Sequence, residues 1–107
     1  MYELRIYHIN PGKLDLVVQR FEQHTFHIFE RLGIQVVDFW VDCSGDDTLY
    51  YIVKWADKAE MDEKWGLFVD DAEWKAAYAD SEKDGETVHT IENHLMERLA
   101  GAPQNWA

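Results

Sequence analysis

The sequence predicts an α+β domain in which a four-stranded antiparallel sheet carries its helices on one face. Three observations lead to this fold class. The chain opens with two-residue alternation, its middle holds two β-rich runs around a turn, and the segments between strands have helical periodicity. The resulting order, β-α-β-β-α-β, is the split βαβ arrangement of ferredoxin-like sandwiches.

The first predicted strand and helix occupy residues 2–33. Residues 2–9, YELRIYHI, alternate with a period of two, which is typical of a strand. Asn10 and Pro11 then supply an N-cap and a first-turn proline. Helical periodicity continues up to Gly33, a residue type that commonly ends helices. The apolar stripe of this helix consists of Leu14, Val17, Val18, Phe21, Thr25, Ile28, Phe29 and Leu32.

A hairpin and a second helical region follow. Residues 34–43 and 48–55 are rich in β-branched and aromatic side chains and flank the turn SGDD, so they predict two adjacent strands. Asp57 and Glu60 then form a start that resembles a capping box. Apolar residues recur at helical spacing after it, and a further short helix is expected to restart at Asp71.

The last part of the chain predicts one more strand and a tail. Residues 87–96 have a weaker strand pattern than the earlier runs. The whole chain has 107 residues, a length suited to a single core. We therefore expect one domain over residues 1–99 and a loose C-terminal tail over residues 100–107, in which Trp106 is the large apolar residue.

Charge and composition narrow the classes of partner. The chain has 10 Lys and Arg against 21 Asp and Glu, a net charge of −11, which repels nucleic acids and anionic lipid surfaces. It has no apolar run near the roughly 20 residues needed to span a membrane. The single cysteine, Cys43, cannot form an internal disulfide. The first residues do not have the pattern of a signal peptide. We expect a cytoplasmic protein with neither nucleic acid nor membrane as partner.

One face of the sheet is left bare by this topology. In the phase we expect, the side chains that face the helices are Leu4, Ile6, Val37, Phe39, Val41, Leu49, Tyr51 and Val53. The outward side then holds Glu3, Arg5, Tyr7, Asp38, Trp40, Tyr50, Ile52 and Lys54. This outward set mixes aromatic side chains with equal numbers of acidic and basic ones. We therefore expect another protein surface to cover it. The expected cover is a second copy, in a homodimer through the sheet face.

Three segments carry a family resemblance over nearly the whole chain, from Tyr2 to Met96. YELRIY, PGKLDLVVQRFEQHTFHIFERLGIQVVDFW and DAEWKAAYADSEKDG resemble the NIPSNAP family of the dimeric α+β-barrel superfamily. The family usually has proline where this chain has Ala72, after Asp71. The resemblance implies the ferredoxin-like fold and a back-to-back dimer that forms the barrel. It implies no established reaction, because one fold hosts many chemistries.

One edge of the first helix is basic. Lys13, Arg20, His24, His27 and Arg31 fall on the same side of the apolar stripe. A metal site is disfavoured, because the spacing of His24 and His27 is three rather than four and arginines flank both. An anion site and a plain solvated helix edge both remain open. His24 is closest to the apolar stripe and is therefore a candidate proton carrier.

The remaining candidates form a predicted pocket. Tyr7 joins His24 as a catalytic candidate, and the predicted ligand-binding residues are Arg5, Asp38, Trp40, Tyr50 and Trp65. We expect a pocket for a small aromatic or carbonyl compound and cofactor-free proton transfer or oxygenation, with no metal and no cofactor. The alternatives are a buried ion-pair network that sets dimer register and a non-catalytic dimeric module for protein association.

Overall fold

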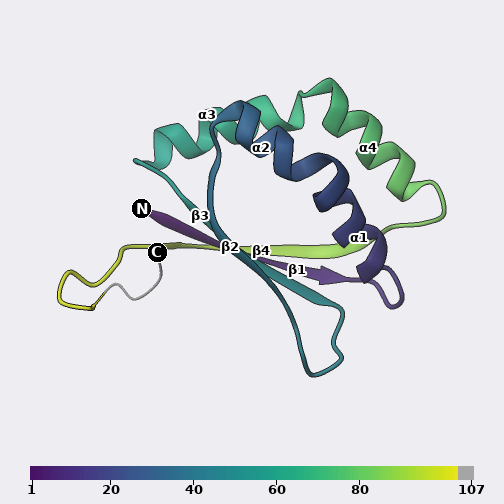
Figure 1. Ribbon diagram of the computed structural model, residues 1–107, viewed down its shortest axis with the longest axis horizontal. Coiled ribbons are helices and arrows are strands. Elements are labelled where there is room, and N and C mark those ends of the chain that lie inside the picture. Colours follow the sequence, from purple (N-terminus) through teal and green to yellow (C-terminus); the bar gives the residue numbers. More distant parts are fainter. Residues whose placement is uncertain (104–107) are drawn as a thin grey trace.

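The computed structural model describes residues 1–103 of the chain. Its helices lie on one side of a twisted sheet, and the two ends of the described chain lie toward the same end of the molecule (Figure 1). The predicted order of elements is confirmed. The elements are β1 (Tyr2–Ile9), α1 (Leu14–Arg20), η1 (Phe21–Thr25), α2 (Phe26–Leu32), β2 (Gln35–Val41), β3 (Thr48–Lys54), α3 (Lys58–Val69), α4 (Ala72–Glu82) and β4 (Val88–Met96).

Within residues 1–103 the sheet has four strands in the order β2-β3-β1-β4, and every neighbouring pair is antiparallel. The split βαβ prediction is therefore confirmed. β1 lies in the interior of the sheet, with Arg5 opposite Tyr51 on β3 and opposite Asn93 on β4. β2 and β4 are the edge strands, so residues far apart in the sequence meet on β1.

The first helical region contains a local departure from the predicted single helix. α1 and α2 are joined by η1, a π-helical segment, and the backbone stays right-handed helical across both junctions. The Thr25 hydroxyl donates to the carbonyl of Arg20 at 3.3 Å, which gives an acceptor in the widened turn a partner. Gly33 ends α2 in the left-handed conformation at φ 73°, as its position predicts.

The two helices in the second half of the chain begin at their predicted N-cap residues. Asp57 accepts from the amide of Glu60 at 2.8 Å, and the Glu60 carboxylate accepts from the amide of Ala56 at 3.0 Å. Asp71 caps α4 by accepting from the amide of Trp74 at 3.1 Å. This cap supports the first turn of α4 without a proline. Among residues 1–103, no helix is long and apolar enough to cross a membrane.

The phase of β1 is the reverse of the expected one. Glu3, Arg5 and Tyr7 face the helices, and Leu4 and Ile6 face outward. Residues directly opposite each other in a sheet share a face. Glu3 pairs with Val53 and Arg5 with Tyr51, and both β3 residues are fully buried beneath the helices.

The expected phase of β3 is confirmed, and that of β2 needs a local change. Leu49, Tyr51 and Val53 are buried in the core, and Phe39 packs against it. A bulge lies between Val36 and Asp38, where the pairing register shifts. The extra residue places Val37 beside Asp38 on the outward face rather than toward the helices.

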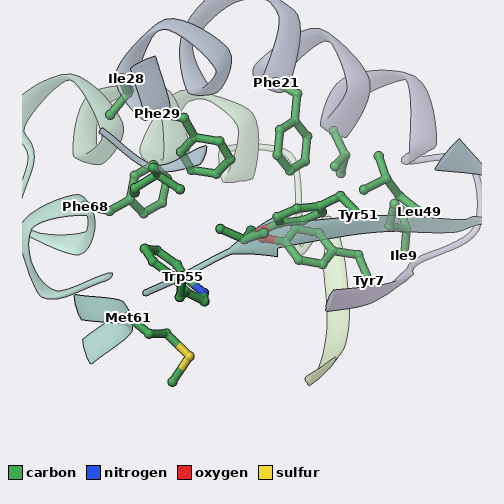
Figure 2. Packing of buried hydrophobic residues seen from close by; sticks show 13 residues of the cluster. Tyr7, Ile9, Phe21, Ile28, Phe29, Leu49, Tyr51, Trp55, Met61 and Phe68 are labelled. Carbon is green, nitrogen blue, oxygen red and sulfur yellow. The ribbon is translucent and has the colours of Figure 1, made fainter. Parts of the chain in front are cut away.

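The core between helices and sheet is mainly aromatic. The Tyr51 ring is stacked on Phe39 with centroids 4.8 Å apart, and it meets Tyr7 and Phe21 edge-on at 5.5 and 5.6 Å. Figure 2 shows Phe21 and Phe29 projecting from the helices toward Tyr51 and Tyr7 on the sheet. The apolar helical stripes predicted from the sequence supply the helix side of this core.

Candidate functional site

A buried carboxylate lies at the centre of the most polar part of the interior. The Glu3 side chain is 1% exposed. Its Oε1 accepts from the indole nitrogens of Trp55 at 3.1 Å and Trp65 at 2.8 Å. Its Oε2 accepts from Arg5 Nη1 and Asn93 Nδ2, both at 3.2 Å. A buried charge is tolerated only when it is paired and hydrogen-bonded, and Glu3 meets both conditions.

Arg5 links this carboxylate to a pair of tyrosines. Its Nε donates to the Tyr51 hydroxyl at 2.7 Å, and its guanidinium lies 4.4 Å from the centroid of the Trp65 ring. Burial lowers the pKa of Arg5, but Tyr51, Tyr7 and Glu3 together outweigh burial and raise it above its ordinary value. Arg5 is therefore a fixed cation inside the domain.

The two tyrosine hydroxyls end the network. Tyr51 is fully buried, and its hydroxyl lies 3.0 Å from that of Tyr7. Burial, followed by the influence of Tyr7, raises the pKa of Tyr51 well above its ordinary value, so Tyr51 keeps its proton at neutral pH. When the Tyr51 hydroxyl donates its hydrogen bond to the Tyr7 hydroxyl, the Tyr7 hydroxyl can donate its own hydrogen bond to a third group. We call the set Glu3, Arg5, Tyr7 and Tyr51 the interior network.

The interior network borders β4, an edge strand of the sheet whose neighbouring side chains are exposed. The Arg5 side chain is 17% exposed, so the structure does not cover its guanidinium fully. Ile91, Asn93 and Leu95 lie opposite Tyr7, Arg5 and Glu3 in the register, and all three β4 residues are exposed. They share the helix-facing side with the network, so no helix covers this side of β4 fully.

Two apolar hollows lie at the opposite, β2 edge of the core. One of about 300 Å³ is bounded by Phe26, Phe29, Ile34 and Phe39, and one of about 200 Å³ lies on the other side of Phe26 and Phe39. These two rings are 4.7 Å apart and separate the hollows. The helix-covered face thus has polar groups toward β4 and apolar hollows toward β2.

A larger groove lies on the outward face of the sheet, which we call the open face. Its volume is about 610 Å³, and it reaches across all four strands. Asp38 and Trp40 line it, so they lie on the opposite side of the sheet from Arg5 and Tyr7. Other lining residues are Tyr2, Val37, Ile52 and Met96.

Comparison with known proteins gives the chain a family. The family model described as NIPSNAP matches residues 2–103. This protein belongs to the NIPSNAP family. A comparison with curated proteins finds none that matches.

Solved structures agree on the fold. A NIPSNAP family protein from Agrobacterium tumefaciens strain C58 is 18% identical with a TM-score of 0.82, and 95% of each chain is covered. An uncharacterized NIPSNAP domain protein from Burkholderia xenovorans is 16% identical with a TM-score of 0.79, covering 96% of this chain and 98% of that one. An antibiotic biosynthesis monooxygenase is 15% identical with a TM-score of 0.62, covering 92% and 99%.

In this NIPSNAP protein the predicted pocket residues divide between the two faces. Arg5, Tyr7 and Trp65 meet in the interior under the helices. Asp38 and Trp40 line the open-face groove, and Tyr50 also faces outward, where its hydroxyl donates to Asp42 at 3.2 Å. The structure does not bring all of them together, because β1 has the reverse of its expected phase.

His24 occupies a third place, at the contact between the first helical region and α4. Its Nδ1 lies 3.1 Å from Glu73 Oε2, and the same oxygen meets His27. Hydrogen bonds from His24 and His27 lower the pKa of Glu73. Arg31 completes this surface cluster with a 2.8 Å ion pair to Asp71. His24 thus connects helices and does not share a site with Tyr7.

Sequence reasoning missed some members of the network. Glu3 and Tyr51 were assigned only to faces of the sheet, and Asn93 received no role. One signal was present: acidic, basic and phenolic side chains alternate on β1 with aliphatic ones, so either face was a plausible interior. Among residues 1–103, no group of three or more His, Cys, Asp or Glu side chains is arranged to hold a metal ion.

Proposed function

We propose that this NIPSNAP protein binds a small carbonyl or aromatic compound at the interior network and catalyses proton transfer without a cofactor. The observation that carries the proposal is the Arg5 guanidinium, which is 17% exposed and lies beside two hydrogen-bonded tyrosine hydroxyls. A guanidinium carries several N–H donors, so a partly exposed one can still donate to a bound oxygen.

The chemistry follows from the charges. A carbonyl oxygen held by the Arg5 guanidinium gains stabilisation as negative charge develops on it in an enolate. Tyr51 keeps its proton and lies beside the Tyr7 hydroxyl, so Tyr7 can give its proton to the carbonyl oxygen and take one back from the neighbouring carbon, which balances as keto–enol exchange. Trp65 offers an aromatic wall beside Arg5. Oxygenation by molecular oxygen, with the substrate itself as the reductant and water as the second product, is a second form of this chemistry, suggested by the monooxygenase that shares the fold.

The proposed working unit is a homodimer through the open face, in a cytoplasmic setting. Leu4, Ile6 and Ile52 lie on this face, and Trp40 is 47% exposed beside them. An apolar sheet surface of this kind favours burial against a second copy. The dimer would leave the interior network on the other side of each sheet.

Ligand-dependent thermal stability tests the binding proposal. We expect some small aromatic or keto acids to stabilise the wild type, by about 2.7 kcal/mol when present at 100 times the dissociation constant. Tyr7→Phe keeps the ring and removes the hydroxyl, so it should lower ligand affinity at least fivefold. Tyr50→Phe, on the open face, is the matched control and should bind as wild type does. Equal ligand shifts in all three proteins would reject the interior site.

A non-catalytic dimeric interaction module is the second candidate. It is favoured by the complete burial of Tyr51 and the four hydrogen bonds accepted by Glu3, which suit a network that only holds strands and helices together. Under this alternative Tyr7→Phe changes stability slightly, and no member of the compound series shifts the melting temperature of the wild type.

A further inference from the structure

The basic edge of the first helical region is divided by the structure. His24, His27 and Arg31 form ion pairs at the surface with carboxylates at the start of α4. Arg20 is buried instead, with a side chain that is 4% exposed. It lies where α1 and α4 run side by side (Figure 1). Arg20 is therefore the buried cation of this edge.

The Arg20 guanidinium is held by α4 but is not fully hydrogen-bonded. It lies 5.0 Å from the centroid of the Trp74 ring and 5.6 Å from that of Tyr78. Its Nη1 donates to the Ser81 hydroxyl at 2.9 Å and lies 3.4 Å from Glu82 Oε1. Its Nε is buried and has no hydrogen-bond partner in the part of the chain that the structure describes. Buried donors in proteins almost always have partners, so this atom needs an acceptor.

Glu82 does not fully neutralise Arg20, because Thr87 engages the same carboxylate. Glu82 Oε2 accepts from the amide of Thr87 at 2.8 Å, and Oε1 accepts from the Thr87 hydroxyl. The carboxylate thus closes the turn after α4 and reaches Arg20 only at 3.4 Å. A buried charge is tolerated when it is both paired and hydrogen-bonded. Arg20 therefore retains capacity for a further anionic group.

Arg20 borders a hollow of about 130 Å³ between the first helical region and α4. At about 30 Å³ for each water, this volume has room for about four water-sized groups, so it suits a small molecule. Gln19 on α1 and Gln23 on η1 line it with amides, which both donate and accept. Asp80 on α4 and Asp84 after it line the hollow with carboxylates.

The charges at this hollow favour a ligand that carries both signs. An inorganic anion would meet Arg20 but would be repelled by Asp80 and Asp84. A simple amine would meet the two carboxylates and leave Arg20 Nε without an acceptor. A small amino acid satisfies both ends, because its carboxylate accepts a charge-assisted hydrogen bond from Arg20 and its ammonium group donates to an aspartate.

We propose that the hollow between α1 and α4 binds a small zwitterionic amino acid of about the size of glycine, alanine or serine. The carboxylate of the ligand accepts from Arg20 Nε, and its ammonium group lies toward Asp80 and Asp84. The lining of the hollow shares no residue with the interior network. This inference therefore does not depend on the proposed chemistry.

The Nε–H signal of Arg20 in a nitrogen–proton NMR spectrum reports on the site directly. Arg20→Lys assigns the signal by removing it. We expect L-alanine to shift this signal in a saturable way. Acetate and ethylamine each carry one of the two charges and should bind at least tenfold more weakly. A signal that glycine, L-alanine and L-serine all leave in place would overturn the proposal, and so would acetate binding as tight as that of L-alanine.

Ala77→Leu should block the hollow. Ala77 lines it and is 7% exposed, so a larger side chain takes the space without a change of charge. Calorimetric titration should show L-alanine affinity at least tenfold weaker than in the wild type. Ala76→Leu, at the neighbouring exposed position of α4, is the matched control and should bind L-alanine as the wild type does. Equal affinity in Ala77→Leu and the wild type would contradict binding in this hollow.

Changes at the two aspartates test the ammonium end without repacking the helices, because both positions are exposed. The double variant Asp80→Asn, Asp84→Asn should bind L-alanine at least tenfold more weakly and should bind acetate no more weakly than the wild type does. Asp62→Asn is the control, since Asp62 is also exposed and paired with a lysine on its own helix. Unchanged L-alanine affinity in the double variant would overturn the assignment of a zwitterion.

Discussion

The two faces of β1 differ in a way that inverts the usual pattern. The helix-covered face carries Glu3, Arg5 and Tyr7, whereas the open face carries Leu4 and Ile6. The buried carboxylate of Glu3 and the guanidinium of Arg5 are tolerated because side chains of neighbouring elements hydrogen-bond to almost all of their polar atoms. The open face has aliphatic residues and a groove instead. Polar character alone therefore does not show which side of a strand is the interior.

The buried face owes its stability to partners from distant segments. Trp55 follows β3, Trp65 lies on α3 and Asn93 on β4, and all three donate to Glu3. The open face needs no such partners because it holds few buried polar groups. Changes on the first face should therefore affect folding, and changes on the second should affect association.

The largest expected effect comes from Glu3→Ala. This change leaves Arg5 charged and buried without its carboxylate, and removing one member of a buried ion pair costs about 3–5 kcal/mol of unfolding free energy. Urea unfolding measures the loss. Glu63→Ala, at an exposed position on α3, should change stability by less than about 0.5 kcal/mol. A loss below about 1 kcal/mol for Glu3→Ala would show that the network is not a structural necessity.

Ile6→Lys should act on the open face instead. A charge at the centre of the proposed dimer surface should weaken association at least a hundredfold, about 2.7 kcal/mol, while the subunit keeps its fold. Sedimentation velocity over a range of concentrations measures the change in mass, and circular dichroism checks the fold. Leu67→Lys, on the exposed side of α3, should leave the mass unaltered. An Ile6→Lys protein with the mass of the wild type would place the dimer contact elsewhere.

Tyr51→Phe should have a smaller effect on the buried face. It removes the acceptor of Arg5 Nε but keeps the ring that packs on Phe39, so the cost is about 1–3 kcal/mol, that of an unsatisfied buried donor. Tyr50→Phe removes the neighbouring hydroxyl on the open face, where water can replace the lost bond to Asp42, and should cost much less. Similar losses for the two variants would mean that Arg5 finds another acceptor.

The smallest expected effect is a pH dependence at Glu73. Its pKa in the folded protein is lowered from an ordinary value of 4.5, first by the hydrogen bond from His24 and then by that from His27. A lowered folded pKa stabilises the protein above the unfolded pKa, and this stability is lost as the pH falls through the folded pKa. Melting temperatures between pH 7 and pH 3 should therefore fall more steeply for the wild type than for Glu73→Gln.

Glu92 on the open face provides a parallel test. His8 and His94 bond to it and lower its pKa in the same way. Glu92→Gln should flatten the acid side of the melting curve to a similar small degree. Identical curves for the wild type and both variants would show that these exposed clusters contribute no stability.

Much of the fold could be predicted from short-range patterns. Alternation over residues 2–9, the caps at Asp57 and Asp71, and the stop at Gly33 act locally, because the groups involved lie within a few residues of each other. The candidate site was predicted only in part. Arg5, Tyr7 and Trp65 were named, but Arg5 and Tyr7 were placed on the outward side of the sheet with Asp38, Trp40 and Tyr50.

The sequence by itself thus determined the elements, their order and the residues able to carry charge into the sheet. Only the tertiary structure decided which face of β1 is buried, because both faces of that strand mix apolar and polar side chains and a strand has no intrinsic preference between them. The choice depends on Trp65 and Asn93, which come 62 and 90 residues after Glu3 and supply the hydrogen bonds that make its burial tolerable.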